Sequence, residues 1–330
     1  KIRLNGDTTI SAGSGAVNLN GAISGDGGDD DLTITGTGVI TIAQDMTATR
    51  SLTTNTGGSV LLKNDITTTG AITLGNTLTI ANGVSSVITS AATADIDQSY
   101  QAIAGADGTG ENLTLMAGNN AASTITVAGT ITNIDTLAIT DAGIVNFNAA
   151  VTVDTLTIPT AVNNVSMIGG GTITDAVTFA NVGTLVIGGD GITTTFNGGL
   201  TAVTQADGVA AISLRGNIVT SEDQITLGTA AKKIRLLGDT VINTAGAGAI
   251  NLNGAISGVL AGGGDDLTIN TTGVVTIAGA MTEVVELTTN AGGSTVLSNG
   301  NITTTGAITI GDTLTIANGV SSVITSAATA

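Results

Sequence analysis

The sequence contains no cysteine, no histidine and no tryptophan, and Pro159 is its single proline among 330 residues. Without cysteine the chain has no disulfide, no thiol nucleophile and no zinc-thiolate site. Without histidine it lacks the side chain that most often acts as a general base near neutral pH. These absences exclude several of the commonest catalytic and metal centres.

Aromatic side chains make up only 1% of the chain, although 42% of the residues are apolar. Most globular interiors rely on large rings for much of their buried surface. A core without them must be built from Val, Ile, Leu and Ala. That composition suits a narrow, layered interior.

Basic residues are also scarce, since 8 Lys and Arg stand against 25 Asp and Glu and give a formal net charge of −17. This charge argues against nucleic acid or an anionic membrane surface as a partner. No run of about 18 apolar residues predicts membrane insertion of this segment, and no charged and apolar leader opens it. The chain begins at Lys1 within a repeat, so we expect it to be a piece of a longer protein.

An internal duplication is the main feature that is present. Residues 1–94 match residues 233–330, with Ile66 corresponding to Ile302 at an offset of 236. The offset grows from 232 to 236 along the match, and each change falls in a stretch rich in Gly, Asp and Asn, where turns tolerate extra residues. Residues 95–232 are more divergent. We therefore expect conserved core elements joined by variable corners.

Apolar residues alternate with Thr, Ser and Asn, which indicates short β-strands. Leu32, Leu52 and Ile72 are 20 residues apart, and their counterparts in the second copy keep nearly the same spacing. Such a period predicts an all-β, parallel β-solenoid with coils of about 20 residues, in which residues 1–330 form one continuous solenoid. An antiparallel sandwich or barrel is the alternative, but the fixed spacing in both copies favours the solenoid.

One coil is expected to contain strands at residues 51–54, 59–62 and 65–68. In the divergent middle, four residues are expected to begin successive coils: Leu113, Leu137, Leu156 and Val177. Residues 95–110, which include Tyr100, are the least regular segment. We expect them to leave the solenoid as an excursion.

Several phrases of the sequence resemble those of known repeat proteins. NLNGAISG from Asn251, VVTIAGAMT from Val274 and NITTTGAITIGDTLTI from Asn301 are similar to the repeat units of the filamentous-haemagglutinin-like and β-strand-repeat adhesins, which are giant bacterial surface proteins. The resemblance implies a right-handed parallel β-helix at the cell surface or released from it, with no catalytic residues in the repeats. It implies a structural shaft of an extracellular fibre or giant adhesin, whose partners are neighbouring repeats or copies of itself end to end.

A calcium site is the one metal centre that the sequence suggests. The stretch GDGGDDDL from Gly25 partly resembles the Gly-Gly-x-Gly-x-Asp calcium repeat, and carboxylate oxygens are preferred calcium ligands. The candidate ligands are Asp29, Asp30, Asp31, Asp265 and Asp266. Calcium-binding rolls repeat this motif in tandem, whereas each copy here has it once. An acidic, solvated corner remains the alternative.

The composition also bears on three other functions. A binding module would bind surface glycans through rows of outward-facing Thr and Asn side chains on successive coils. An ice-binding surface would need paired Thr columns, and the column of Thr33, Thr53 and Thr73 lacks a second member. An enzyme would need clustered acidic and basic groups on one strand face, whereas the basic residues are scattered. We expect no enzyme activity and no cofactor other than possible calcium.

Overall fold

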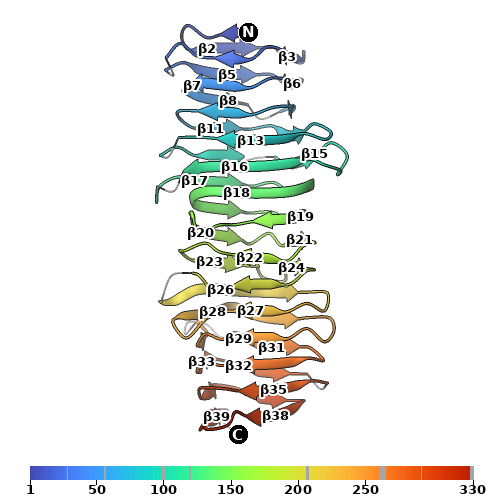
Figure 1. The fold of residues 1–330 in the computed structure, drawn as a ribbon, viewed down its shortest axis with the longest axis vertical. Coiled ribbons are helices and arrows are strands. Elements are labelled where there is room, and N and C mark those ends of the chain that lie inside the picture. Colours follow the sequence, from blue (N-terminus) through green and yellow to red (C-terminus); the bar gives the residue numbers. More distant parts are fainter. Residues whose placement is uncertain are drawn as a thin grey trace. The chain divides into compact units, whose positions relative to one another are not determined.

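The computed structural model describes residues 1–27, 29–55, 57–91, 93–98, 101–118, 120–205, 208–259, 265–290 and 292–327. The chain forms two compact units, Lys1–Ser166 and Met167–Ala330, here called unit 1 and unit 2. The described residues form strands and no helix, and therefore include no helix that could cross a membrane. Each unit is a parallel β-solenoid, with coils roughly 22 residues apart (Figure 1).

Three strands per coil in unit 1 lie on three faces, which we name by the strands they contain. Face A has β1 (Ile2–Arg3), β4 (Ile23–Ser24), β7 (Met46–Thr49), β10 (Ile66–Thr68), β13 (Ser85–Thr89) and β16 (Asn112–Gly118). Face B has β2 (Thr8–Ser11), β5 (Asp31–Thr35), β8 (Ser51–Thr54), β11 (Ile72–Leu74), β14 (Ile96–Gln98) and β17 (Thr124–Val127). Face C has β3 (Val17–Leu19), β6 (Val39–Ile42), β9 (Ser59–Leu62), β12 (Thr77–Ile80) and β15 (Ile103–Gly105).

Longer strands turn the corners further along unit 1. The strand β18 (Ile131–Phe147) pairs in succession with β15, β16 and β17, so it runs across all three faces. It bends near Asn133, which has a positive φ of 54°. The remaining strands are β19 (Val151–Thr157) and β20 (Val162–Met167).

Unit 2 also has three faces, and each takes the letter of the face in unit 1 whose sequence it repeats. Face A has β23 (Leu185–Ile187), β30 (Ile256–Ser257), β33 (Met281–Val284), β36 (Ile302–Thr304) and β39 (Ile324–Ser326), and face B has β21 (Gly171–Ile173), β24 (Thr193–Phe196), β31 (Leu267–Asn270), β34 (Leu287–Thr289) and β37 (Ile308–Ile310). Face C has β22 (Val177–Phe179), β25 (Leu200–Ala202), β27 (Ile225–Leu227), β29 (Ile250–Leu252), β32 (Val274–Ile277), β35 (Ser294–Leu297) and β38 (Thr313–Ile316). Two long strands, β26 (Gly208–Val219) and β28 (Lys232–Asn243), contribute to faces A and B.

The core of each unit consists of columns of aliphatic side chains. Leu52 pairs with Leu32 in the coil before it and with Ile72 in the coil after it, and these side chains are at most 1% exposed. Unit 2 repeats this column with Leu267, Leu287 and Ile308. Parallel pairing at constant register places equivalent residues of successive coils on top of one another. The columns predicted from the 20-residue spacing are therefore confirmed.

The divergent middle differs from two sequence-based expectations. Residues 95–110 are not an excursion, because Ile96 pairs with Ile72 and Ile103 pairs with Leu78 as in a regular coil. The expectation was wrong because the extra residues lie in the loops between strands, while the strands keep their pairing. Tyr100 lies outside the described residues.

The proposed column of coil starts is correct in part. Leu137 pairs with Leu113 and with Leu156, as expected. Val177 begins β22, where it pairs with Leu200, and its place in the column after Leu156 stays a prediction. That the two units form one continuous solenoid stays a prediction.

We predict that Leu52→Ala destabilises unit 1 by about 2–5 kcal/mol, because it leaves a cavity within a column that neighbouring coils hold open. Thr53→Ala changes an outward residue of the same strand and should cost less than about 1 kcal/mol. Hydrogen exchange of the β8 amides measures the free energy of local opening. Equal losses of protection in the two variants would contradict the assignment of inward and outward positions.

Candidate functional site

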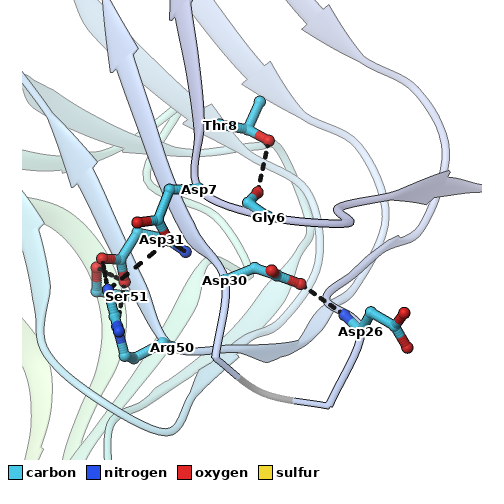
Figure 2. Close-up of polar contacts among 8 residues, drawn as sticks. All are labelled: Gly6, Asp7, Thr8, Asp26, Asp30, Asp31, Arg50 and Ser51. Carbon is cyan, nitrogen blue, oxygen red and sulfur yellow. Dashed lines mark hydrogen bonds and ion pairs between the residues drawn. The ribbon is translucent and has the colours of Figure 1, made fainter.

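The acidic corner of unit 1 lies in the loop between β4 and β5. Asp30 is only 6% exposed, and its Oδ2 accepts a 2.6 Å hydrogen bond from the backbone N–H of Asp26. Its own carbonyl oxygen accepts a bond from the N–H of Arg50, one coil further on. Asp30 therefore closes its loop and attaches it to the next coil (Figure 2).

The corresponding corner of unit 2 uses the same device. Asp265 is 7% exposed, its Oδ2 accepts a hydrogen bond from the N–H of Val259, and its carbonyl accepts one from Val285. Because a buried carboxylate is stable only when hydrogen-bonded, these two aspartates have a structural reason to recur at a corner of variable length.

Gly25 and Gly258 begin the two loops, and each lies too close to the next coil for a side chain. A Cβ at Gly25 would collide with the carbonyl oxygen of Ala48, and one at Gly258 would collide with that of Glu283. Ala48 and Glu283 themselves have positive φ angles of 54° and 61°. The same backbone irregularity thus recurs beside both acidic corners, and the loops are equivalent.

Asp31 and Arg50 form the strongest charged contact of the unit 1 corner. Arg50 Nε donates to Asp31 Oδ1 over 2.8 Å, its Nη2 pairs with Oδ2, and Ser51 Oγ donates to Oδ1 over 2.7 Å. Asp7, one coil earlier, accepts a 3.0 Å bond from the N–H of Asp31 and lies 3.7 Å from Arg50 Nη2. Figure 2 shows Arg50 reaching this pair of stacked aspartates.

This contact changes the ionisation of both partners. The hydrogen bond from Arg50 is the main reason that the pKa of Asp31 is lowered below its ordinary 3.8. Asp31, first by its hydrogen bond and then by its charge, raises the pKa of Arg50. Asp31 and Arg50 therefore form an ion pair at pH values above the lowered pKa of Asp31.

Unit 2 has the acidic stack without the arginine. Asp266 donates its N–H to Asp239 over 3.2 Å and accepts a 3.0 Å bond from the N–H of Glu286, so three acidic residues lie on successive coils. Val285 occupies the place of Arg50, since both donate their N–H to the corner aspartate. In the described part of the chain, no lysine or arginine forms an ion pair with this stack.

The five predicted calcium ligands are not brought together as one set. Asp30 and Asp265 bond to their own loops, Asp31 binds Arg50, Asp266 bonds to backbone, and Asp29 is exposed. Gly28 and residues 260–264, which belong to the two motifs, lie outside the described residues. Among residues that are described, no three His, Cys, Asp or Glu side chains are placed to hold a metal. Calcium at these corners stays a prediction.

A groove in unit 2 was not anticipated from the sequence. It has a volume of about 320 Å³ and is lined by polar and small residues: Asn243, Ala245, Gly246, Asn270, Thr271, Thr272 and Asn290. Asn243 lies in register with Asn270, and Asn290 follows one coil later. The groove therefore presents three amide side chains at the spacing of the coils.

Comparison with unit 1 separates the structural asparagine from the others. Asn290 Oδ1 accepts a 3.1 Å bond from the N–H of Thr271, and Asn55 Oδ1 accepts an equivalent 3.0 Å bond from Gly36. Asn243 and Asn270 instead correspond to Ser11 and Thr35, which lie in register in unit 1. A comparison of the two copies at outward corner positions was the signal that would have found this groove.

Comparison of the chain with protein-family models, with curated proteins and with solved structures found no match.

Exchanging Arg50 and Val285 between the two corners tests their electrostatics. We predict that Arg50→Val lowers the melting temperature of unit 1 and that Val285→Arg raises that of unit 2, each by about 1–2 °C, because such exposed ion pairs contribute little. Both changes should shrink in about 1 M salt, which screens exposed charges. Hydrogen exchange followed by mass spectrometry assigns each effect to its unit.

The same variants predict a pH dependence. A carboxyl with a lowered pKa stabilises the folded chain above its unfolded pKa, and this stabilisation is lost as the pH falls through the folded pKa. The difference between the wild type and Arg50→Val should therefore be constant at neutral pH, begin to shrink near the unfolded pKa of about 3.9, and vanish only below the lowered pKa of Asp31. A difference that grows on acidification would contradict the assigned partner of Asp31.

Proposed function

We propose that this chain is a structural shaft, a rigid spacer of an extracellular bacterial fibre or giant surface adhesin, with no catalytic role. The observation that carries the proposal is the repetition of the same buried columns in units 1 and 2. The buried corner aspartates Asp30 and Asp265 recur as well. The repeat units preserve what holds coils together and vary on the outside, as a spacer requires.

The physics of a solenoid supports this role. Backbone hydrogen bonds run from each coil to the next, and every coil buries its apolar side chains against its neighbours. Stability then grows with the number of coils, so duplication adds length at little cost to the fold. The resemblance to filamentous-haemagglutinin-like and β-strand-repeat proteins agrees with this role. Its natural partners would be neighbouring repeats or further copies of the chain.

Electron microscopy of filaments from producing cells tests the proposal. A repeat of 236 residues at roughly 22 residues per coil corresponds to about 11 coils, and coils stack at about 4.8 Å. We predict filaments with an axial period of about 50 Å. Compact particles without this period, or turnover of a glycan substrate by the purified chain, would contradict a purely structural role.

The groove of unit 2 favours a second candidate function, a cell-surface glycan-binding module. The Asn243 amide oxygen is held by the N–H of Ala245, so its NH₂ group can donate to a ligand, and Asn270 forms no side-chain hydrogen bond to a described residue. Amides one coil apart match a neutral chain of hydroxyl groups. The net charge of −17 disfavours an acidic glycan.

The duplication supplies the control for this candidate. Asn243→Ser combined with Asn270→Thr converts the groove to the residues of unit 1 and leaves the structural Asn290 in place. We predict that this variant loses at least tenfold in affinity for any neutral glycan that the wild type binds, as measured by calorimetry after a glycan array screen. Unchanged affinity would exclude the groove as the binding site.

A further inference from the structure

The loop between β15 and β16 (Figure 1) is longer than the loop between β12 and β13, which precedes it at the same corner of unit 1. It contains a group of carboxylates. The loop reads Asp107-Gly-Thr-Gly-Glu111, and both of its glycines have positive φ angles, 82° and 86°. Left-handed glycines at alternate positions curl the loop. The polar residues at positions 107, 109 and 111 consequently lie on one short turn.

Glu111 is fully buried, with an exposed fraction of 0%. Its Oε1 accepts a 3.3 Å bond from the N–H of Gly83, in the preceding coil. Its Oε2 is buried and has no hydrogen-bond partner. A buried carboxylate oxygen without a partner is costly, and a proton or a cation normally compensates for it.

The Glu111 carboxyl group faces that of Asp107, within hydrogen-bonding reach. Asp107 Oδ1 already accepts bonds from the Thr109 N–H at 3.1 Å and the Thr109 hydroxyl at 2.8 Å, and its Oδ2 accepts one from Asn82. The Thr109 hydroxyl is the main reason that the pKa of Asp107 is lowered. Asp107 is thus held in its charged form beside the Glu111 carboxyl group, whose hydrogen bond also lowers the pKa of Asp107.

The surroundings add further negative charge. Asp135, in the next coil, accepts a bond from the Gly110 N–H and donates its own N–H to the Glu111 carbonyl over 2.8 Å. Across the residues for which the structure gives contacts, no lysine or arginine pairs with Asp107, Glu111 or Asp135. The charge of this loop is therefore not balanced by the protein itself.

We propose that the loop binds a calcium ion between Glu111 Oε2 and the Asp107 carboxylate. The Asn82 amide lies against Asp107, and a turn of that amide would offer a third oxygen; backbone carbonyls and water complete the shell. Calcium accepts such irregular sets of oxygen ligands, whereas magnesium requires near-octahedral geometry and keeps its water. The site is separate from the corners at Asp29–Asp31 and Asp265–Asp266, and does not depend on the proposed function.

Two carboxylates form a weak site, and we expect a dissociation constant in the range of about 10⁻⁴ to 10⁻³ M that is typical of extracellular calcium modules. Calorimetric titration of the full chain with calcium should show this binding. In 10 mM calcium the melting temperature of the wild type should rise by about 3 °C relative to EDTA. Magnesium at the same concentration should give a smaller rise.

Glu111→Gln keeps the shape of the side chain and the acceptor for Gly83, and removes the charge. We predict that this variant loses at least tenfold in calcium affinity, while in EDTA it melts at or above the wild type because the repulsion with Asp107 is gone. Asp107→Asn should lose calcium in the same way, and it provides a second test if Glu111→Gln folds poorly. Asp29→Asn combined with Asp266→Asn is the matched control and should bind calcium normally.

Three results would overturn the proposal. Calcium binding that survives in Glu111→Gln and Asp107→Asn would place the ion elsewhere, and its loss in the control variant would place it at the corners. A wild-type melting temperature that does not change with calcium and rises as the pH is lowered would show that the two carboxyl groups share a proton instead.

Discussion

The parallel hydrogen-bond ladder from coil to coil is the constraint on which the rest of this structure depends. Because each strand bonds in register to the strand one coil away, Leu52 must lie between Leu32 and Ile72. A side chain substituted at this position would therefore contact the equivalent residues of the coils before and after it. Aliphatic side chains of similar size satisfy this condition along a whole column. A large ring has to be accommodated by its neighbours in the stack, which accounts for an interior with few aromatics; Phe179 and Phe196 in unit 2 are buried as an edge-to-face pair.

The hydrogen-bond ladder constrains the strands but not the residues at the corners. Two kinds of corner occur in this chain. Some corners are tightly held, as at Gly25 and Asp30, where the loop contacts the next coil too closely for a Cβ and a buried carboxylate collects backbone N–H groups. Others differ between the copies without disturbing the core, as at Arg50 and Val285. Outward and corner positions are therefore the places where two copies of one scaffold can acquire different charge and different recognition chemistry.

Charge in this molecule is arranged along the same axis as the hydrogen bonds. Stacking places like residues above one another, so acidic side chains on successive coils repel unless something lies between them. Arg50 lies against both Asp7 and Asp31 and reduces their repulsion. The stack of Asp239, Asp266 and Glu286 is joined by backbone N–H groups and has no such arginine among the described residues. The buried Glu111 beside Asp107 is the extreme case, because no lysine or arginine of the described residues pairs with either carboxyl group.

The sequence by itself determined the fold class, the duplication and the buried columns, because alternation and a fixed period translate directly into inward positions that stack. It could not recognise residues 95–110 as a regular coil, since loop length hides the register. It drew attention to the acidic corner but not to the partners there. That Asp30 closes its loop, that Arg50 reaches two coils, and that Asn82, Asp107 and Glu111 meet were decided at the level of tertiary structure, because these side-chain directions depend on how each corner bends.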